Sequence, residues 1–304
     1  MRIIINPKYD YLNSYLHSIP SEFDKQKGGI LYEARNLLRK VRIDNIELVI
    51  KSFRKPRLLN RFVYTFLRKP KALRSYQYSQ ILLDREILAP DPVACILEYR
   101  NKLITRSYYV NRYERSQTVR KLMEDSIKGN EGKLHAFSEF LVRLHQKGVL
   151  HLDLSPGNIL MHTSDTHGYE FSLIDVNRMK FQSKIDIKTA CYNLRRLCTS
   201  RDVLEYIASE YAMIRGWDKN DMVYYAQHYS DNFFRKFFYH RASTRSKAKN
   251  IHWIILRFYI YTHLRKLLPA QMNLSQKIFD KEKHIYMKYL TKYDFRKIFY
   301  QDYL

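Results

Sequence analysis

Three polar side chains within residues 149–178 have the types and spacing that phosphoryl transfer requires. Asp153 and Asn158 lie in the loop His151–Asn158, whose pattern is H-x-D-x-x-x-x-N, and Asp175 follows a short apolar run. In this chemistry one aspartate accepts the proton of the attacking hydroxyl, while an asparagine and a second aspartate hold Mg²⁺ on the nucleotide phosphates. We therefore expect Asp153 to be the catalytic base, and Asn158 and Asp175 to be the metal ligands.

A predicted β-hairpin brings Asp175 back beside Asn158. Residues 158–161 and 170–174 both have the character of strands, and the polar stretch 163–168 joins them. The spacing therefore aims the three candidate side chains into one site. The alternative is that the polar residues of the loop only form an ordinary turn.

Lys51 is the candidate for a lysine that binds the α- and β-phosphates. Three short strands are predicted over 29–35, 37–43 and 46–52, and Asp44-Asn45 is a hairpin signal between the last two. Lys51 lies inside the third strand, which is where phosphoryl-transfer enzymes of this type carry that lysine. An exposed strand lysine with no ligand is the alternative.

Two features expected around such a lysine are altered. A glycine-rich loop should join the first two strands, but residues 32–36 contain no glycine, so backbone amides and Arg35 would have to contact the phosphates. The helix predicted over 72–88 should carry a glutamate that pairs with Lys51. It has Gln77 at the best candidate position, which can orient the lysine by a hydrogen bond but brings no opposing charge.

Positive charge dominates the chain. The formal net charge is +24, and residues 51–74 carry nine Lys or Arg, interleaved with aromatic residues, and no Asp or Glu. This composition predicts an anion-facing surface next to the active site, and its alternative is a solvated basic loop. A nucleic-acid groove uses the same residue types, so composition alone does not choose between the partners.

Cysteine usage and hydropathy give expectations about the compartment. Cys95, Cys191 and Cys198 form no CxxC pair and are typical of free thiols in a reducing cytoplasm. No secretory signal is visible, and the most apolar late stretch, 253–261, is too short to cross a membrane and contains Arg257. We expect any membrane association to be peripheral.

Further helices are predicted over 134–146, 187–215 and from 218 onward, after two β-rich runs over 93–100 and 103–111. The core candidates of the helix over 187–215 are Tyr192, Leu194, Leu197, Leu204 and Ile207. Residues 233–266 combine basic and aromatic side chains, a composition compatible with a helix on an anionic membrane. Core helices with basic outer faces would have the same composition.

These motifs resemble the kinase-like superfamily and, within it, the lipopolysaccharide core kinase family (Kdo/WaaP) of Gram-negative bacteria. The matching stretches are VIKSFRKP around Lys51, HLDLSPGNIL at 151–160 and LIDVNRMKF at 173–181. The resemblance implies an α+β, bilobal protein-kinase-like fold with a small β-rich N-lobe and a larger helical C-lobe. It also implies ATP and Mg²⁺ as cofactors, and lipopolysaccharide or another anionic glycolipid as acceptor at the inner membrane.

The corresponding domain prediction is an N-terminal arm over 1–27, the N-lobe over 28–112 and the C-lobe with its basic helical tail over 113–304. Protein kinases usually carry a lysine two residues after the catalytic aspartate, and this chain has Ser155 there, which favours an acceptor other than a protein. The alternatives are a catalytically weak module that binds nucleotide or anionic lipid, and a kinase for a protein or another small alcohol. A nucleic-acid partner has only the charge in its favour.

Overall fold

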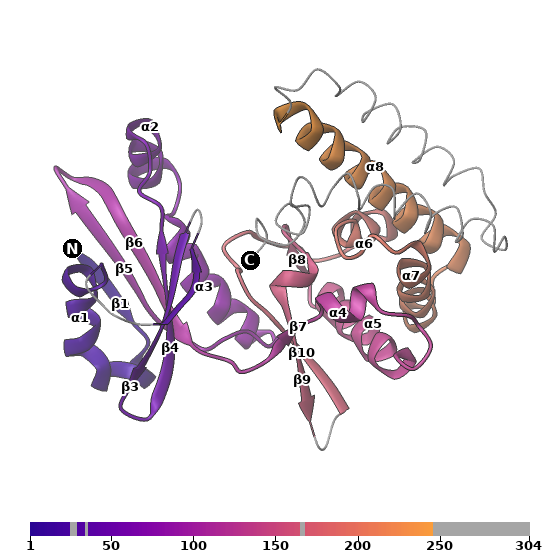
Figure 1. Cartoon of the computed structure of the whole chain (residues 1–304), viewed down its shortest axis with the longest axis horizontal. Helices are drawn as coiled ribbons and strands as arrows, with labels where there is room; N and C mark the ends of the chain where they lie inside the picture. The colour runs from indigo at the N-terminus through magenta and orange to yellow at the C-terminus, as the bar shows by residue number, and fades with distance from the viewer. Residues whose placement is uncertain (25–28, 34–35, 165–167, 246–304) are drawn as a thin grey trace. The chain divides into compact units, whose positions relative to one another are not determined.

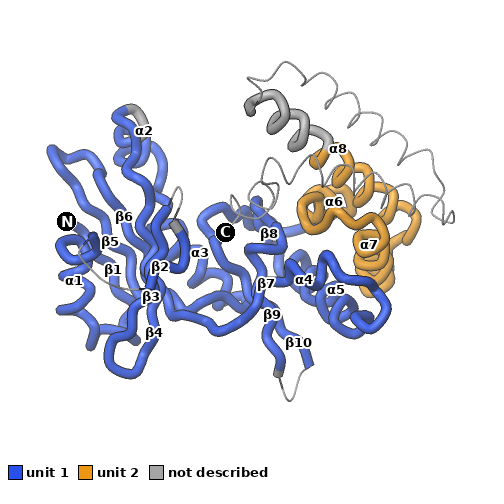
Figure 2. Tube along the Cα trace, viewed as in Figure 1, with its two compact units in different colours: residues 1–185 blue, residues 186–304 orange. Residues whose placement is uncertain are grey.

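The computed structural model describes residues 1–24, 29–33, 36–164 and 168–245 (Figure 1). The chain divides into two compact units, residues 1–185 and 186–304 (Figure 2). Within the described ranges, no helix is long and apolar enough to cross a membrane. The described candidate site residues all belong to the first unit: Lys51, Gln77, Asp153, Asn158 and Asp175.

The first unit begins with a six-stranded antiparallel sheet, in the order β1-β5-β6-β4-β3-β2. Its strands are β1 (Arg2–Ile5), β2 (Gly29–Glu33), β3 (Asn36–Ile43), β4 (Ile46–Phe53), β5 (Pro92–Arg100) and β6 (Leu103–Arg112). The three strands predicted around Lys51 are confirmed, with ends that differ by at most two residues. Asp44 has a φ of 50°, as a two-residue hairpin turn between β3 and β4 requires.

Side chains alternate along these strands, so the sheet has two apolar faces, each covered by a different helix. One face packs against the 3-10 helix η1 (Pro7–Leu12) and α1 (Asn13–Glu22). The other face packs against α3 (Lys71–Asp84), and Phe53 belongs to this second cluster. Lys51 has the same parity in β4 as Phe53, so it lies on the face that α3 covers.

Residues 1–24, the described part of the predicted N-terminal arm, form a strand and then a helical stretch. β1 pairs with β5 from Arg2↔Leu97 to Ile5↔Ala94, so it adds an edge strand to the sheet. The helical stretch that follows buries a stripe at helical spacing, made of Leu12, Leu16, Ile19 and Phe23. Polar neighbours and two prolines, Pro7 and Pro20, obscure that stripe in the sequence.

α3 ends four residues earlier than predicted, at Asp84 rather than Leu88. The Arg85 N–H lies within hydrogen-bonding distance of the last carbonyl groups of the helix, and Glu86 has a φ of 55°. A left-handed residue at this place ends a helix before any proline is needed. The helix therefore ends before it reaches Pro90 and Pro92.

The second half of the first unit supports the loop 151–158 with a helix and two small sheets. α5 (Glu131–Gln146) buries the stripe that the sequence predicted, Leu134, Phe137, Phe140, Leu141 and Leu144. β9 (Ile159–Ser164) lies between β10 (Gly168–Leu173) and β7 (Gln117–Thr118), and β8 (Val149–His151) pairs with β11 (Met179–Phe181). Phe171 of β10 packs edge-on against Phe137, with 5.1 Å between the ring centroids, which ties α5 to the hairpin.

The second unit contains α6 (Ile187–Leu194), α7 (Arg201–Arg215) and α8 (Lys219–Arg245). The helix predicted over 187–215 is therefore interrupted, because Ser200 caps a new helix by accepting a hydrogen bond from the Val203 N–H. Leu194, Leu197, Leu204 and Ile207 are buried as predicted. Tyr192 is 53% exposed, so its assignment to the core was wrong.

Candidate active site

His151 fixes the start of the candidate catalytic loop. Its ring is fully buried at the end of β8. Nδ1 accepts a hydrogen bond from the Asp153 N–H (3.1 Å), and Nε2 lies 3.1 Å from the Ile174 carbonyl oxygen. This pattern places the ring proton on Nε2. His151 thus joins the segment that carries Asp153 to the one that precedes Asp175. Sequence reasoning missed this positioning contact, although the H-x-D spacing places the histidine two residues before Asp153.

Asn158 folds back onto the same loop. It ends the short 3-10 helix η3 (Pro156–Asn158), and its Nδ2 donates a hydrogen bond to the Asp153 carbonyl oxygen at 2.9 Å. The amide oxygen Oδ1 is then left for another partner, and oxygen is the ligand atom that Mg²⁺ prefers. The side chain is only 8% exposed, so its orientation is held by the surrounding structure.

The predicted hairpin between Asn158 and Asp175 is confirmed. Leu173 lies opposite Ile159, and the Ile174 N–H donates to the Asn158 carbonyl oxygen at 3.0 Å. Asp175 follows directly and has a φ of 53°, in the left-handed region that few residues other than glycine adopt. The strained residue turns the chain out of the strand at the place where the carboxylate is needed.

Lys51 and Asp175 form an ion pair. Lys51 Nζ lies 2.7 Å from Asp175 Oδ1, and the lysine side chain is 11% exposed. Asn177 Nδ2 donates a further hydrogen bond to the same oxygen. Burial alone would raise the pKa of Asp175, but the charge and hydrogen bond of Lys51 hold that pKa below its ordinary value of 3.8. The carboxylate is therefore ionised at neutral pH.

Asp153 lies beside positive charge of its own. Its Oδ2 is 3.7 Å from Arg178 Nη1, a residue that the chain places three positions after Asp175. Ser155, in the position where protein kinases carry a lysine, is 6% exposed, and its Oγ has no hydrogen-bond partner among the described residues. A buried hydroxyl of this kind is available to a ligand atom that enters the site.

The helix that faces Lys51 contributes cations rather than an acid. Within the described residues, α3 has no Asp or Glu before Asp84. Burial lowers the pKa of Lys71. The negative charge of Asp175 raises this pKa and the positive charge of Lys51 lowers it, so the charges of these three residues influence one another. Arg74 is 7% exposed, its Nε has no hydrogen-bond partner among the described residues, and burial lowers its pKa. Asp175 therefore takes the place of the expected glutamate as the charge partner of Lys51.

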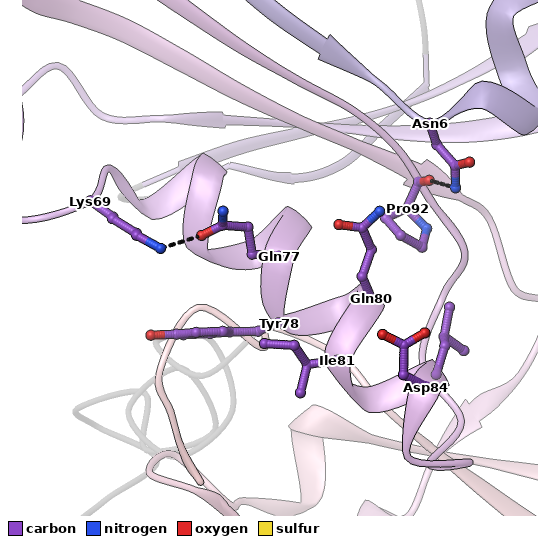
Figure 3. A pocket seen from close by; sticks show the side chains of 9 residues that line it. Asn6, Lys69, Gln77, Tyr78, Gln80, Ile81, Asp84 and Pro92 are labelled. Atoms are coloured by element: carbon purple, nitrogen blue, oxygen red, sulfur yellow. Dashed lines mark hydrogen bonds between the residues drawn. The ribbon is translucent and has the colours of Figure 1, made fainter.

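Gln77 does not reach Lys51 in this structure. It lines a pocket of about 590 Å³ along α3, where its Oε1 accepts a hydrogen bond from Lys69 Nζ at 2.9 Å (Figure 3). No hydrogen bond or ion pair joins Gln77 to Lys51 in the part of the chain that the structure describes. Arg35, the other residue predicted to contact phosphates, lies outside the described residues.

The donor set of the site fits Mg²⁺ rather than a metal held by protein alone. The described residues contain no group of three or more His, Cys, Asp and Glu that could hold a metal ion. Mg²⁺ keeps several waters and is usually bound by one or two protein oxygen ligands together with substrate phosphates. The Asp175 carboxylate and the Asn158 amide oxygen, which the hairpin joins, match that requirement.

One protein-family model matches the chain. The sequence profile of the Lipopolysaccharide kinase (Kdo/WaaP) family matches residues 35–229, a range that includes the whole candidate site. No protein with a curated description matches the chain in sequence.

The solved structures that are similar to the chain include the following two. "WaaP in complex with acyl carrier protein" is 14% identical, with a TM-score of 0.52, and the match covers 76% of this chain and 99% of that one. The Rio2 kinase–ADP/Mg²⁺–phosphoaspartate complex from Chaetomium thermophilum is 16% identical, with a TM-score of 0.42, and the match covers 86% of this chain and 78% of that one. The likeness to WaaP confirms the predicted α+β, protein-kinase-like fold.

The profile match extends over more than half of the 304 residues and contains Lys51, Asp153, Asn158 and Asp175. The matched family is the one that the three sequence motifs resemble. The chain therefore belongs to the lipopolysaccharide kinase (Kdo/WaaP) family and is a phosphotransferase with an alcohol group as its acceptor.

Proposed function

We propose that the chain transfers the γ-phosphate of ATP to a sugar hydroxyl of the lipopolysaccharide core or of a related lipid-linked saccharide. It would do so as a peripheral protein at the cytoplasmic face of the inner membrane. The observation that carries this proposal is the 2.7 Å contact between Lys51 Nζ and Asp175 Oδ1, beside the loop of Asp153 and Asn158. Family membership supports a lipopolysaccharide acceptor.

In this proposal Asp153 orients the attacking sugar hydroxyl and accepts its proton. The Asn158 side chain and His151 both hydrogen-bond the backbone of Asp153, so the carboxylate is held for this task before the substrate arrives. Arg178, 3.7 Å from the carboxylate, keeps positive charge beside the base. A cation at this place would stabilise negative charge on the phosphates of the donor or the acceptor.

Positive side chains hold the donor. Lys51 would bind the α- and β-phosphates, and Lys71 and Arg74 would add charge that stabilises the transferring group. Asn158 and Asp175 would hold Mg²⁺, which when bound neutralises charge on the phosphate oxygens. Arg35 would contribute a further cation near the phosphates, and Gln77 would join the donor site only if α3 rearranges.

Ser155 supports an acceptor other than a protein. Protein kinases usually contact the γ-phosphate with a lysine in this position, whereas the short Ser155 hydroxyl leaves more room for a carbohydrate acceptor. The proposed lobes extend over residues 28–112 and 113–304, and the predicted arm over 1–27 adds β1 to the sheet of the N-lobe. An acyl carrier protein is a further candidate partner, because the similar structure WaaP was solved in complex with one.

Thermal unfolding with ATP, in the presence and absence of Mg²⁺, tests the proposal. A ligand at a hundred times its dissociation constant stabilises by about 2.7 kcal/mol, so the wild-type midpoint should rise clearly with MgATP. Asp175→Asn should lose the Mg²⁺-dependent part of that rise. Asp202→Asn, on the exposed first turn of α7, serves as a matched control and should keep it.

The opposite result separates the alternatives. If millimolar MgATP leaves the wild-type midpoint unchanged, the chain is a kinase-like binding module instead, and the absence of an acid before Asp84 on α3 explains why. If MgATP stabilises the protein but no phosphate reaches lipopolysaccharide, a protein or another small alcohol becomes the acceptor to test.

A further inference from the structure

The segment between β4 and α3 exposes four large apolar side chains. It consists of α2 (Leu58–Phe62) and the π-helical turn η2 (Val63–Leu67). Leu58, Phe62, Phe66 and Leu67 are 71%, 54%, 61% and 74% exposed, and we call them the apolar ridge. The Phe62 and Phe66 rings contact each other, with 4.8 Å between their centroids. Adjacent exposed side chains of this size mark an interaction site, whereas single ones are ordinary.

Polar contacts hold the segment against the sheet. Thr65 Oγ1 donates to the Arg61 carbonyl oxygen at 2.7 Å and accepts from the Ile104 N–H of β6 at 3.1 Å. Ile104 pairs with Tyr99 of β5, so the segment lies beside the end of the β5–β6 hairpin (Figure 1). Tyr64 also packs against the apolar cluster between the sheet and α3, so Tyr64 and Thr65 face the sheet while the ridge faces away from it.

Basic side chains surround the ridge. From residue 48 to residue 83 the chain has no Asp or Glu. The exposed cations on either side of the ridge are Arg54, Lys55, Arg57, Arg68 and Lys69. The neighbouring hairpin end adds Arg100 and Lys102, which are also exposed. An apolar centre with a basic rim is complementary to a surface whose outer layer is anionic and whose interior is apolar.

We propose that the apolar ridge inserts into the interface of an anionic membrane, while the surrounding Lys and Arg contact the lipid headgroups. Interfacial helices bind in this way, through buried apolar side chains together with attraction to anionic lipid. The inference deepens the proposed function and rests on it for the choice of partner, since it names the surface by which the enzyme reaches a lipid-linked acceptor.

Two observations favour lipid over other polyanions and over protein. Nucleic-acid bases stack on aromatic rings, but the two most exposed members of the ridge, Leu58 and Leu67, have no π-face. Stable protein interfaces bury roughly 20–30 residues on each side, many more than the ridge and its rim contain. A lipid interface needs no shape complementarity, so a small apolar ridge with a basic rim is sufficient.

The ridge also lies at a useful place in the chain. It connects the strand that carries Lys51 to the helix that begins at Lys71. Insertion at this segment would therefore bring the two elements of the phosphate site close to the membrane that holds the acceptor. It would do so without using any residue that we place in the catalytic machinery.

Vesicle co-sedimentation of the full chain tests the inference. The vesicles contain phosphatidylcholine alone, or phosphatidylcholine with phosphatidylglycerol. Wild type should bind the anionic vesicles more tightly, and added salt should weaken that binding. Phe62→Ser/Phe66→Ser should lower the partition coefficient by at least about tenfold, because each ring that leaves the interface loses its transfer free energy. The matched control, Tyr11→Ser/Met213→Ser, removes two side chains of similar exposure, 65% and 66%, and should bind like wild type.

Each contrary outcome has a defined meaning. Unchanged binding of the Phe62/Phe66 variant would show that another surface holds the lipid, and would overturn the proposal. Absence of wild-type binding to anionic vesicles would overturn it too, and would leave a protein as the occupant of the ridge. The MgATP-dependent thermal shift is measured on the same variants and should match wild type. A wild type that binds vesicles but ignores MgATP would refute the nucleotide proposal while the ridge proposal stands.

Discussion

At the scale of single residues, the site depends on which partner satisfies each buried charge. Lys51 is 11% exposed, and the described part of α3 offers it no acid before Asp84, so Asp175 is the anion that compensates it. His151 acts through two hydrogen bonds, to the Asp153 N–H and the Ile174 carbonyl oxygen. The candidate site therefore combines two ion pairs, Lys51–Asp175 and Arg178–Asp153, with neutral hydrogen bonds that fix its shape.

Asp153→Asn should abolish transfer and preserve donor binding. The amide has almost the same shape as the carboxylate but cannot accept the proton of the acceptor hydroxyl. We expect the rate of phosphate transfer to fall by about 10²–10⁴-fold, the usual contribution of a positioned general base. The MgATP-dependent thermal shift should remain. Transfer at the wild-type rate would remove Asp153 from the role of base.

The thiols of Cys95 and Cys191 should be unreactive in the native chain. Both side chains are fully buried, and burial raises the pKa of each to about 12. Because only the thiolate reacts, a disulfide reagent at pH 8 should modify them slowly, and rapidly once denaturant is added. Mass mapping of labelled peptides would identify the sites. Rapid native labelling of Cys95 would show that the sheet opens far more often than its packing suggests.

At the scale of elements, the turn between α5 and β8 sets the position of the loop. Gly148 has a φ of 69°, and a Cβ on it would lie 1.9 Å from the Gln182 carbonyl oxygen. Its own carbonyl oxygen accepts a hydrogen bond from the Gln182 N–H at 2.8 Å, next to the pairing of β8 with β11. The strand that presents His151 therefore requires a residue with no side chain at this turn.

Gly148→Ala should destabilise the chain by about 2–4 kcal/mol, the sum of a strained φ and a clash with fixed backbone. Gly129→Ala is the matched control, since Gly129 has a φ of 83° but a Cβ there would meet nothing within 4 Å. It should cost about 1 kcal/mol, because only the strained φ remains. Urea unfolding measures both. Equal losses in the two variants would show that the contact with Gln182 is relieved without cost.

The sequence predicted those elements whose signal is local. The strands from 29 to 53 alternate and turn at Asp44-Asn45, and the stripe of α5 repeats at helical spacing, so both were correct. α1 was missed because its four apolar residues gain meaning only when a sheet face lies opposite them. Tyr192 was placed in the core because its spacing fits, although its ring lies near the surface and packs edge-on against Tyr229.

Some residues of the candidate site could likewise be predicted from local sequence, and others could not. Asp153, Asn158 and Asp175 follow from one loop and one hairpin, so the sequence was enough to bring them together. The charges that Lys71 and Arg74 contribute depend on how α3 packs beside β4, which spacing along the chain does not encode. Gln77 had the best position by counting turns, but in the structure it bonds to Lys69.

At the scale of the whole molecule, a net charge of +24 opposes compaction. Much of that excess is local, because the stretch from 48 to 83 has no acid to offset its cations. Added salt screens such repulsion, over about 8 Å at physiological ionic strength. Screening should therefore stabilise this chain more than it weakens the exposed ion pairs of the described residues.

Raising the salt concentration should raise the unfolding midpoint of the chain. We expect a gain of about 1 kcal/mol, or roughly 2–4 °C for a protein of this size. The matched variant Lys55→Gln/Arg57→Gln/Lys69→Gln removes three exposed cations from the acid-free stretch, and should begin with a higher midpoint and gain less from salt. Equal salt responses in the two proteins would show that the repulsion lies elsewhere in the chain.

Lys51 and Asp175 neutralise each other across 2.7 Å. In the proposed function Lys51 binds phosphate and Asp175 binds Mg²⁺. A nucleotide alone would then leave the Asp175 carboxylate without its positive partner, and a metal alone would leave the Lys51 ammonium without its negative partner. An uncompensated buried charge costs about 3–5 kcal/mol, less here because the Asp175 side chain is 35% exposed. Together the two ligands replace both halves of the pair. Nucleotide and metal would then bind with positive heterotropic cooperativity, each raising the affinity for the other by the same factor.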